Sequence, residues 1–210
     1  MSPVANPSSV FSEAIAEHLA VIDSLRQQQP LLQRIAEEMT SAILAGKKIL
    51  WCGNGGSAAD SQHLAAELMG RFRRERRGLP SIALTTDTSI LTAVANDYGY
   101  ERIFQRQVEA LCTNGDVLVG ISTSGSSQNV CAALQTARQL GAFTVAFTGQ
   151  GGGAMASLAD VTLCINSKDT ARIQEGHILC GHMLCDWIEY HVCRSNSNTK
   201  TGNIAEDSSV

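Results

Sequence analysis

Residues 48–57 read Lys-Ile-Leu-Trp-Cys-Gly-Asn-Gly-Gly-Ser, a short apolar run that ends in a glycine-rich turn. The run has the length of a buried strand, and glycine lets the backbone turn tightly into a following helix. Similar apolar runs, separated by helix-like segments, occur at Ser81–Thr85, Val117–Ile121, Thr144–Phe147 and Val161–Ile165. This alternation is typical of parallel strands joined by crossover helices, so the sequence predicts an α/β fold with a five-stranded parallel sheet.

Helices are predicted on both sides of this alternating region. Apolar residues recur at helical spacing near the N-terminus, at Val10, Phe11, Ile15, Leu19 and Ile22. A second helix is bracketed by Pro30 and Gly46, and a last helix runs from about Ala171 to Cys193. We divide the chain into N-terminal helices (1–46), a central α/β domain (47–194) and a polar tail (195–210) that we expect to be disordered.

The composition is that of a soluble globular protein. The 210 residues are 44% hydrophobic and 17% charged, and the apolar stretches fall far short of a bilayer span. The N-terminus lacks the basic cluster and apolar core of a secretory signal, and the seven cysteines are an odd number without C-x-x-C spacing. We therefore expect a cytoplasmic protein with reduced thiols. The net charge of −4 argues against a nucleic-acid partner, and no membrane partner is expected.

A cluster of arginines occupies positions 71, 73, 74, 76 and 77. Such a cluster can attract a phosphate or an acidic protein surface. A solvated helix end or a subunit contact is the more ordinary interpretation, and we favour it.

Loops rich in glycine and hydroxyl groups follow the predicted strands. In an open parallel sheet, ligands bind beyond the carboxyl ends of the strands, where loops lead into helix N-termini. The unusual loops are Gly53–Ser57, the one leading to Asn96-Asp97, Ser122–Ser127 and Gly149–Gly153. The loop Ser122–Ser127 has five hydroxyl side chains around one glycine, so we predict that it binds a phosphate.

A dinucleotide site is the alternative for the first loop. Residues 53–58 fit the pattern G-x-G-x-x-A, which alone is a weak signal. That fold needs an acidic residue about 20 positions further on to hold the ribose, and Asp87 comes well after that point. We therefore regard nicotinamide binding as unsupported.

Histidines and acids recur on two predicted helices. His63 and Glu67 lie four residues apart, so they share one helix face and can bind one cation or assist one proton transfer. Alone, such a pair is more often structural. The last helix carries Gln174, Glu175, His177 and His182. Ionisable groups in a buried helix must be paired or functional.

Together these motifs resemble the sugar isomerase (SIS) domain, and within it the bacterial phosphoheptose isomerases, over about residues 8–193. The motifs that carry the resemblance are Cys52–Ser57, Gln62-His63 with Glu67, Ala95-Asn96-Asp97, Gly120–Gly125, and Ala171–Glu175 with His182. The resemblance implies a three-layer α-β-α SIS domain with extra N-terminal helices. It also implies a homotetramer with active sites between subunits.

Roles for individual residues follow from the same resemblance. The positions that hold the sugar phosphate in the family correspond to Asn54, Gly55, Gly56, Glu67, Asn96, Asp97, Ser122, Thr123, Ser124, Ser127 and Gln174. The family's zinc ligands correspond to His63, Glu67, Gln174 and His182. Glu67 and His182 are the implied proton-transfer groups in the conversion of sedoheptulose 7-phosphate to D-glycero-D-manno-heptose 7-phosphate through an enediol. This is the first step of nucleotide-activated heptose biosynthesis.

Two positions depart from the family pattern. Ser126 stands where the family often has Asn, and Ala171 stands where some members carry Asp. A polar group is kept at the first position, whereas any role of the second carboxylate must be absent or filled elsewhere.

A non-catalytic class of SIS proteins is the main alternative. Its members form a tetrameric scaffold that binds the bacterial replication initiator protein, and their last helix is similar. That class lacks the acid and the late histidine, which are present here as Glu67 and His182. The sequence therefore favours an enzyme.

Overall fold

A parallel sheet forms the middle layer of the protein, as the sequence predicts. The computed structural model describes residues 9–202. The strands are β1 (Ile49–Gly53), β2 (Ser81–Ala83), β3 (Val117–Ser122), β4 (Phe143–Thr148) and β5 (Val161–Cys164). They pair in the order β2-β1-β3-β4-β5, and every pairing is parallel. The chain places β2 on one side of β1 and then β3, β4 and β5 on the other side. The loops after β1 and β3 therefore lie at the switch point, where ligands bind in such sheets.

Helices cover both faces of the sheet and complete the predicted three layers. One face packs against α2 (Gln29–Leu44), α3 (Gly56–Met69) and α8 (Thr170–Gly202). The other face packs against α5 (Ile103–Leu111), α6 (Gln128–Gln139) and α7 (Met155–Leu158). Successive side chains of a strand point to opposite faces, which is why Trp51 belongs to the first core and Leu50 to the second.

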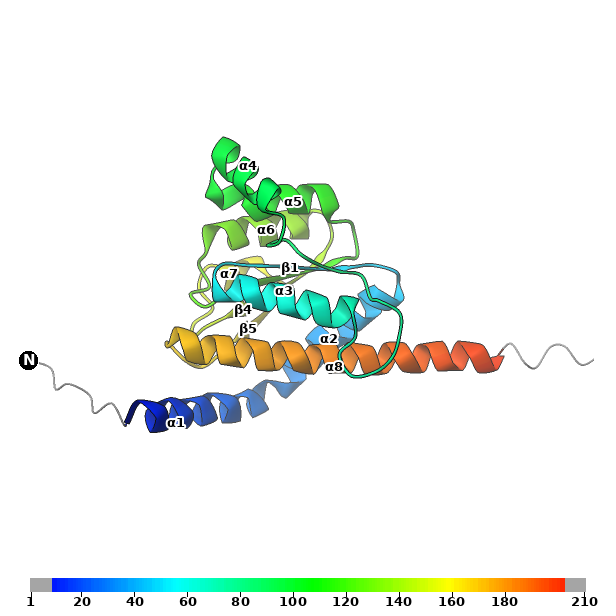
Figure 1. Ribbon diagram of the computed structural model, residues 1–210, viewed down its shortest axis with the longest axis horizontal. Helices are drawn as coiled ribbons and strands as arrows, with labels where there is room; N and C mark the ends of the chain where they lie inside the picture. The colour runs from blue at the N-terminus through cyan, green and yellow to red at the C-terminus, as the bar shows by residue number, and fades with distance from the viewer. Residues whose placement is uncertain (1–8, 203–210) are drawn as a thin grey trace, which may run out of the picture.

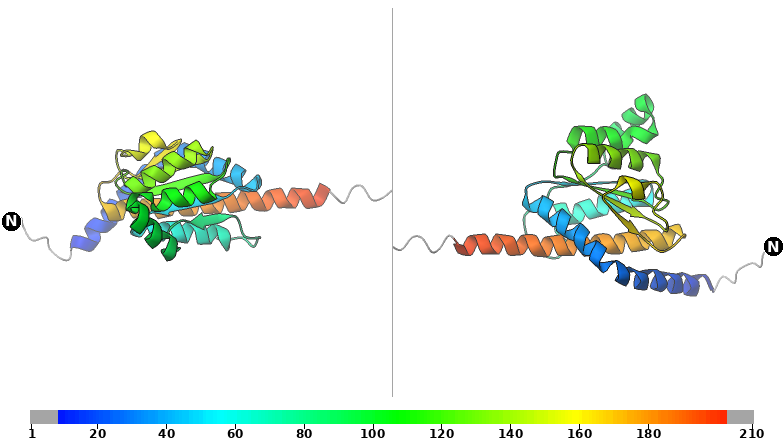
Figure 2. Two further views of the ribbon diagram at one scale, coloured as in Figure 1. Left: turned by 90° about the horizontal axis from the view of Figure 1, so that it is seen from above. Right: turned by 180° about the vertical axis from the view of Figure 1, so that it is seen from behind.

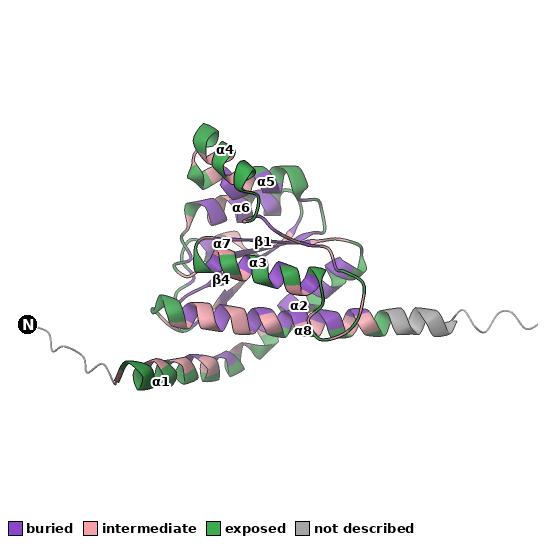
Figure 3. Cartoon of the chain, in the orientation of Figure 1, coloured by how far each residue is buried: buried purple, intermediate pink, exposed green. Residues whose placement is uncertain are grey.

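Two helices lie outside these layers. The helix α4 (Thr88–Tyr98) has no buried residue and is followed by the 3₁₀ helix η2 (Tyr100–Arg102), which leads into α5 (Figures 1 and 3). The helix α1 (Ser9–Ser24) runs beside the start of α8 and joins α2 through the 3₁₀ helix η1 (Leu25–Gln28) (Figure 2). His18 Nδ1 lies 2.8 Å from Glu175 Oε2, so a hydrogen bond helps to hold α1 against α8.

The last helix is longer than the sequence analysis predicts. It continues past Cys193 to Gly202, whereas the sequence analysis ends it near Cys193 and places residues 195–202 in the tail. Polar side chains support the added turns, since Arg194 Nη1 donates to the hydroxyl of Tyr190 (2.6 Å) and Ser195 Oγ to the carbonyl of His191 (3.1 Å). The rest of the predicted tail, 203–210, lies outside the described residues.

The arginine cluster binds acids of α8 within the same chain. The backbone N–H groups of Phe72, Arg73 and Arg74 donate to the carboxylate of Glu189 at 2.7–2.9 Å. Arg76 Nε lies 3.2 Å from the same carboxylate, and both side chains are buried. Arg73 and Arg74 also pair with Asp186 (3.0 and 2.6 Å). These three arginines are therefore not simply a solvated helix end, because they anchor the loop after α3 to α8.

Two further expectations concern the chain as a whole. No helix in the range 9–202 combines the length and the hydropathy needed to cross a bilayer. The seven cysteines all lie in this range and form no disulfide, in agreement with the prediction of reduced thiols.

Candidate active site

The predicted phosphate loop connects β3 to α6 at the switch point of the sheet. Ser122 Oγ lies 2.8 Å from Ser127 Oγ and 3.3 Å from Ser124 Oγ, so these hydroxyls converge. Ser127 is the N-cap residue of α6, whose first N–H groups and positive dipole end therefore face the loop. Converging hydroxyls beside a helix N-terminus form a site suited to a phosphate.

The loop Gly149–Gly153 supports the phosphate loop from behind. Gly149 N donates to the carbonyl of Thr123 (3.0 Å), and Met155 N donates to the carbonyl of Gly125 (2.9 Å). A Cβ atom on Gly125 or Gly153 would collide with the backbone of the other loop, and both glycines have positive φ. The glycines are therefore needed for this close approach. They explain a motif that the sequence analysis assigned to ligand binding.

Gln174 on α8 lies against the glycine-rich loop after β1, at the start of α3. A Cβ atom on Gly56 would overlap the Gln174 amide, so the two residues are in direct contact across α3 and α8. Gly55 has a φ of +57°, a conformation that glycine adopts without strain. Gln174 is thus placed beside the predicted substrate loop.

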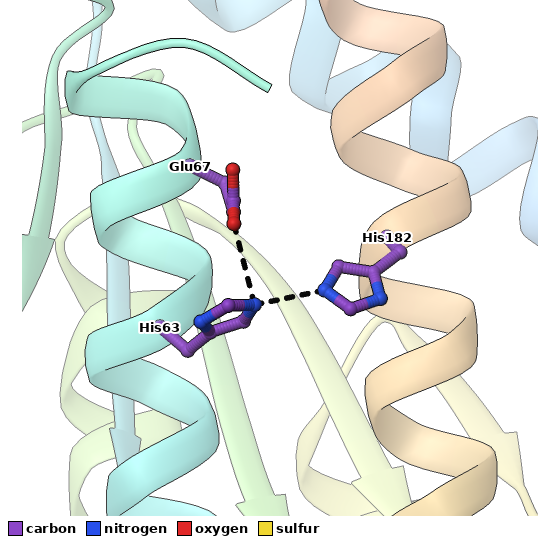
Figure 4. Close-up of side chains that lie close together, drawn as sticks. All are labelled: His63, Glu67 and His182. Carbon is purple, nitrogen blue, oxygen red and sulfur yellow. Dashed lines mark hydrogen bonds and ion pairs between the residues drawn. The ribbon is translucent and has the colours of Figure 1, made fainter. Parts of the chain in front are cut away.

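A cluster of His63, Glu67 and His182 lies further along α3 and α8 (Figure 4). The Nε2 atoms of the two imidazoles are 2.8 Å apart, and Glu67 Oε1 is 3.3 Å from His63 Nε2. His63 and Glu67 share a face of α3 because they are four residues apart. Partial burial and the neighbouring imidazole lower the pKa of His182 below its ordinary value, and Phe72 stacks on its ring. A neutral imidazole can ligate a metal or take up a proton.

Gln174, the fourth predicted ligand, contacts Gly56 at the other end of α3. The ligand atoms of His63, Glu67 and His182 all lie within 4.8 Å of one another. Gln174 precedes His182 by more than two turns of α8, which is about 12 Å along the helix axis. The donors present, two imidazole nitrogens and a carboxylate oxygen, are of the types that would suit a divalent cation such as zinc.

Asn96 and Asp97 lie at the end of the exposed helix α4. Asn96 Nδ2 donates to Asp97 Oδ1 at 2.8 Å. Among the described residues, neither side chain forms a hydrogen bond or ion pair with a predicted site residue outside this pair. The connection to the site runs through the adjacent segment, where the hydroxyl of Tyr100 donates to Asn54 Oδ1 at 3.0 Å.

Other polar residues of the last helix have structural roles. His177 is buried, and its Nε2–H donates to the carbonyl of Thr148 at 3.0 Å. Burial lowers the pKa of His177 to about 4, so the ring stays neutral.

The backbone N–H of Ala171 donates to Asp169 Oδ1 (2.9 Å), so a carboxylate two positions earlier caps α8.

The sequence analysis missed three polar residues near the site. Asn129 pairs with Asn54, and Tyr100 reaches the same amide. Asp60 lies on the face of α3 between Gly56 and His63, and its Oδ2 is buried without a hydrogen-bond partner. Burial raises the pKa of Asp60 to about 6, an effect that His63 partly offsets. The three-residue spacing of Asp60 and His63 was the available signal for this residue.

Comparison with known proteins identifies the family of this chain. The family model described as SIS domain matches residues 11–149. The phosphoheptose isomerase of Aquifex aeolicus is 54% identical over 184 residues, covering 88% of this chain and 95% of that protein. The one from Roseiflexus is 53% identical over 189 residues, with 88% and 96% covered.

Solved structures give the same result. The phosphoheptose isomerase of Neisseria gonorrhoeae superimposes with a TM-score of 0.83 at 43% identity, covering 88% of this chain and all of that one. The enzyme of Francisella tularensis gives a TM-score of 0.81 at 38% identity, covering 90% of this chain and all of that one. The chain therefore belongs to the SIS-domain family and, within it, to the phosphoheptose isomerases.

Proposed function

We propose that this protein converts sedoheptulose 7-phosphate into D-glycero-D-manno-heptose 7-phosphate, the first step of nucleotide-activated heptose biosynthesis. The observation that carries the proposal is the pairing of a hydroxyl-lined loop at a helix N-terminus with a compact imidazole–carboxylate cluster on α3 and α8. Substrate and product are isomers: two hydrogens leave C1 and its oxygen, and two are added to C2 and its oxygen. The reaction therefore needs an anchor for the phosphate and groups that move protons.

The phosphate loop supplies the anchor. The hydroxyls of Ser122, Ser124 and Ser127 donate to phosphate oxygens, together with N–H groups at the start of α6. Binding energy at the phosphate is remote from the reacting carbons. It orients the substrate and so lowers the entropic part of the barrier.

Proton transfer is assigned to Glu67 and His182. In the first half of the reaction a proton leaves C1 of the ketose and a proton is delivered to the carbonyl oxygen at C2, which gives the enediol. In the second half a proton leaves the oxygen at C1 and a proton is delivered to C2, and Glu67 and His182 share these transfers. Both groups contact the His63 ring: His182 Nε2 lies 2.8 Å and Glu67 Oε1 3.3 Å from His63 Nε2. The substrate-binding role of Gln174 is supported by its contact with Gly56.

A zinc ion is the proposed cofactor, one per site. The residues that hold it are His63, Glu67 and His182, with Gln174 as the fourth candidate from the sequence. When bound, a divalent cation would either stabilise negative charge on the carbonyl and enediolate oxygens or mainly order its ligands.

The proposed assembly is a homotetramer with shared sites, located in the cytoplasm. The outer face of α1 exposes large apolar side chains, Val10 (53%), Phe11 (76%), Ile15 (61%) and Leu19 (61%). Such a stripe is suited to burial against another subunit. The distance between Gln174 and the His63 cluster also supports a site that a neighbouring chain completes.

Incubation with sedoheptulose 7-phosphate tests the reaction. A new aldose C1 proton signal should appear in the NMR spectrum as the ketose is consumed. A non-catalytic SIS protein that binds the replication initiator would leave the ketose unchanged. The Glu67→Gln variant serves as the control for a contaminating isomerase, because its sample would contain the same contaminant.

A further inference from the structure

Two buried or half-buried amides join the loop after β1 to the helix after β3. Asn54 Nδ2 donates to Asn129 Oδ1 at 2.9 Å, and Asn129 Nδ2 donates back to Asn54 Oδ1 at 2.8 Å. Asn129 is only 3% exposed and lies in the first turn of α6. The pair therefore bridges the two loops that meet at the switch point of the sheet.

Backbone geometry determines the orientation of both amides. The N–H of Val130 donates to Asn129 Oδ1 at 2.9 Å, so this atom must be the oxygen. The nitrogen of Asn129 then faces Asn54, which must present its own oxygen there. The hydroxyl of Tyr100 donates to the same oxygen at 3.0 Å, which agrees with this assignment. Reversing either amide would place two donors or two acceptors opposite each other.

The hydrogen-bonding capacity of Asn54 is largely used by these contacts. Its oxygen accepts from both Asn129 and Tyr100, which occupies its two lone pairs. Its nitrogen donates once to Asn129, which leaves a second N–H for a ligand. Asn54 also lines a pocket of about 300 Å³ together with Tyr100, Ser127 and Asn129. A substrate in that pocket can therefore receive one hydrogen bond from the Asn54 side chain.

We propose that Asn129 is a positioning residue of the isomerase. Through the amide pair it holds the loop after β1 at a set distance from the phosphate loop and aims the second N–H of Asn54 at a substrate oxygen. This inference rests on the proposed function. Because the side chain of Asn129 is 3% exposed and its amide is paired with that of Asn54, Asn129 acts through Asn54.

Three variants and one control test the proposal. Asn129→Ala removes the pair, whereas Asn129→Asp keeps the size and both acceptor contacts but loses the donor to Asn54. Asn54→Ala removes the group that is positioned. Gln107→Ala is the matched control, since Gln107 is a buried amide (6% exposed) that donates to the carbonyls of Leu84 and Ile103 away from the site. Each is measured for kcat, KM and Tm.

The expected loss in kcat/KM for both Asn129 variants is about 10²-fold, the usual effect of a misplaced site group. Competitive inhibition by inorganic phosphate should stay within about twofold of the wild type, because the serine hydroxyls are unchanged. In the Asn54→Ala background, Asn129→Ala should change kcat/KM by no more than about twofold. Gln107→Ala should lower Tm and leave kcat/KM of the folded protein unchanged.

Separate results overturn the two proposals. A wild-type protein that does not turn over sedoheptulose 7-phosphate overturns the proposed function. If the wild type is active, the positioning role is overturned by unchanged kinetics in Asn129→Asp. It is also overturned by Asn129 effects that persist fully without the Asn54 side chain. If Asn129→Ala does not fold, the kinetics of Asn129→Asp test the positioning role.

Discussion

The Nε2 atoms of His63 and His182 lie 2.8 Å apart although the residues are 119 positions apart in the chain. Their helices, α3 and α8, run side by side, since Leu64 packs against Gly181 and Gln174 packs against Gly56. At this distance one ring nitrogen carries the proton that the other accepts. Glu67, four residues after His63, adds a carboxylate to the same face of α3.

Metal binding is the first prediction from this relationship. We expect one divalent cation per chain, and zinc at 100 times its Kd should stabilise the metal-free protein by about 2.7 kcal/mol. Elemental analysis and thermal scans with and without zinc measure both. His63→Ala should lose the metal, whereas His191→Ala, at a histidine bonded to Trp187 on α8, should retain it. Full activity after complete chelation would leave only acid–base roles for the cluster.

The role of Glu67 is the second prediction. A carboxylate beside a cation has a lowered pKa and is a weaker base, so ligation and proton abstraction by Glu67 oppose each other. If Glu67 is the base, Glu67→Gln should bind substrate but lose about 10²–10⁴ in turnover. Solvent deuterium incorporation at C1 measures the step directly. Normal exchange in a substrate-binding Glu67→Gln variant would show that another group is the base.

Phosphate binding by the serine loop is the third prediction. Ser124→Ala should weaken substrate binding by about 1.5–3 kcal/mol, roughly 10- to 150-fold, because a hydrogen bond to a charged group is lost. KM and inhibition by inorganic phosphate measure the effect. Ser126→Ala is the neighbouring control, since the Ser126 hydroxyl lies 3.4 Å from the Ser124 carbonyl and is outside the predicted set. Equal effects of the two substitutions would contradict the assignment.

Acid stability is the fourth prediction and concerns Glu189. Burial alone would raise the pKa of Glu189, but the N–H groups of Phe72, Arg73 and Arg74 and the charge of Arg76 hold it below its ordinary value. The unfolded chain therefore binds a proton more readily. The stability that Glu189 contributes is present above its unfolded pKa of about 4.3 and is lost as pH falls through the folded pKa.

Urea unfolding of Glu189→Gln measures this contribution. At pH 7 the variant should lose about 3–5 kcal/mol, because Arg76 is left buried without its partner charge. Its stability should also depend less on pH below 5 than that of the wild type. Glu75→Gln is the matched control, because Glu75 is 87% exposed and pairs with Arg71 at 3.6 Å. A similar loss in both variants would contradict a special role for Glu189.

Assembly is the fifth prediction. Light scattering should give the mass of four chains, and Phe11→Asp should shift it towards smaller species, because a charge cannot be buried in an apolar interface. Leu140→Asp, at a side chain that is 39% exposed after α6, serves as the control. A monomer at micromolar concentration that turns over substrate would contradict the shared site.

The sequence by itself determined the fold class and the ligand-binding edge of the sheet. Apolar runs such as 117–121 report burial on both faces, and parallel strands place their following loops at one edge. The serine hydroxyls of 122–127 were predictable for that reason. The end of the last helix was not, because polar residues beyond Cys193 support helix and coil almost equally until side chains such as Arg194 and Tyr190 bond one turn apart.

Tertiary structure decided which groups meet. Helical periodicity gives the direction of a side chain around its own axis, but not the neighbouring helix or the level at which the two helices touch. Gln174 and His182 project within a similar arc of α8, yet the contact with α3 places one beside Gly56 and the other beside His63. The amide pair of Asn54 and Asn129 likewise exists only because β1 and β3 are neighbours in the sheet. Packing between segments distant in sequence, which local patterns do not encode, therefore defines the chemistry of the site.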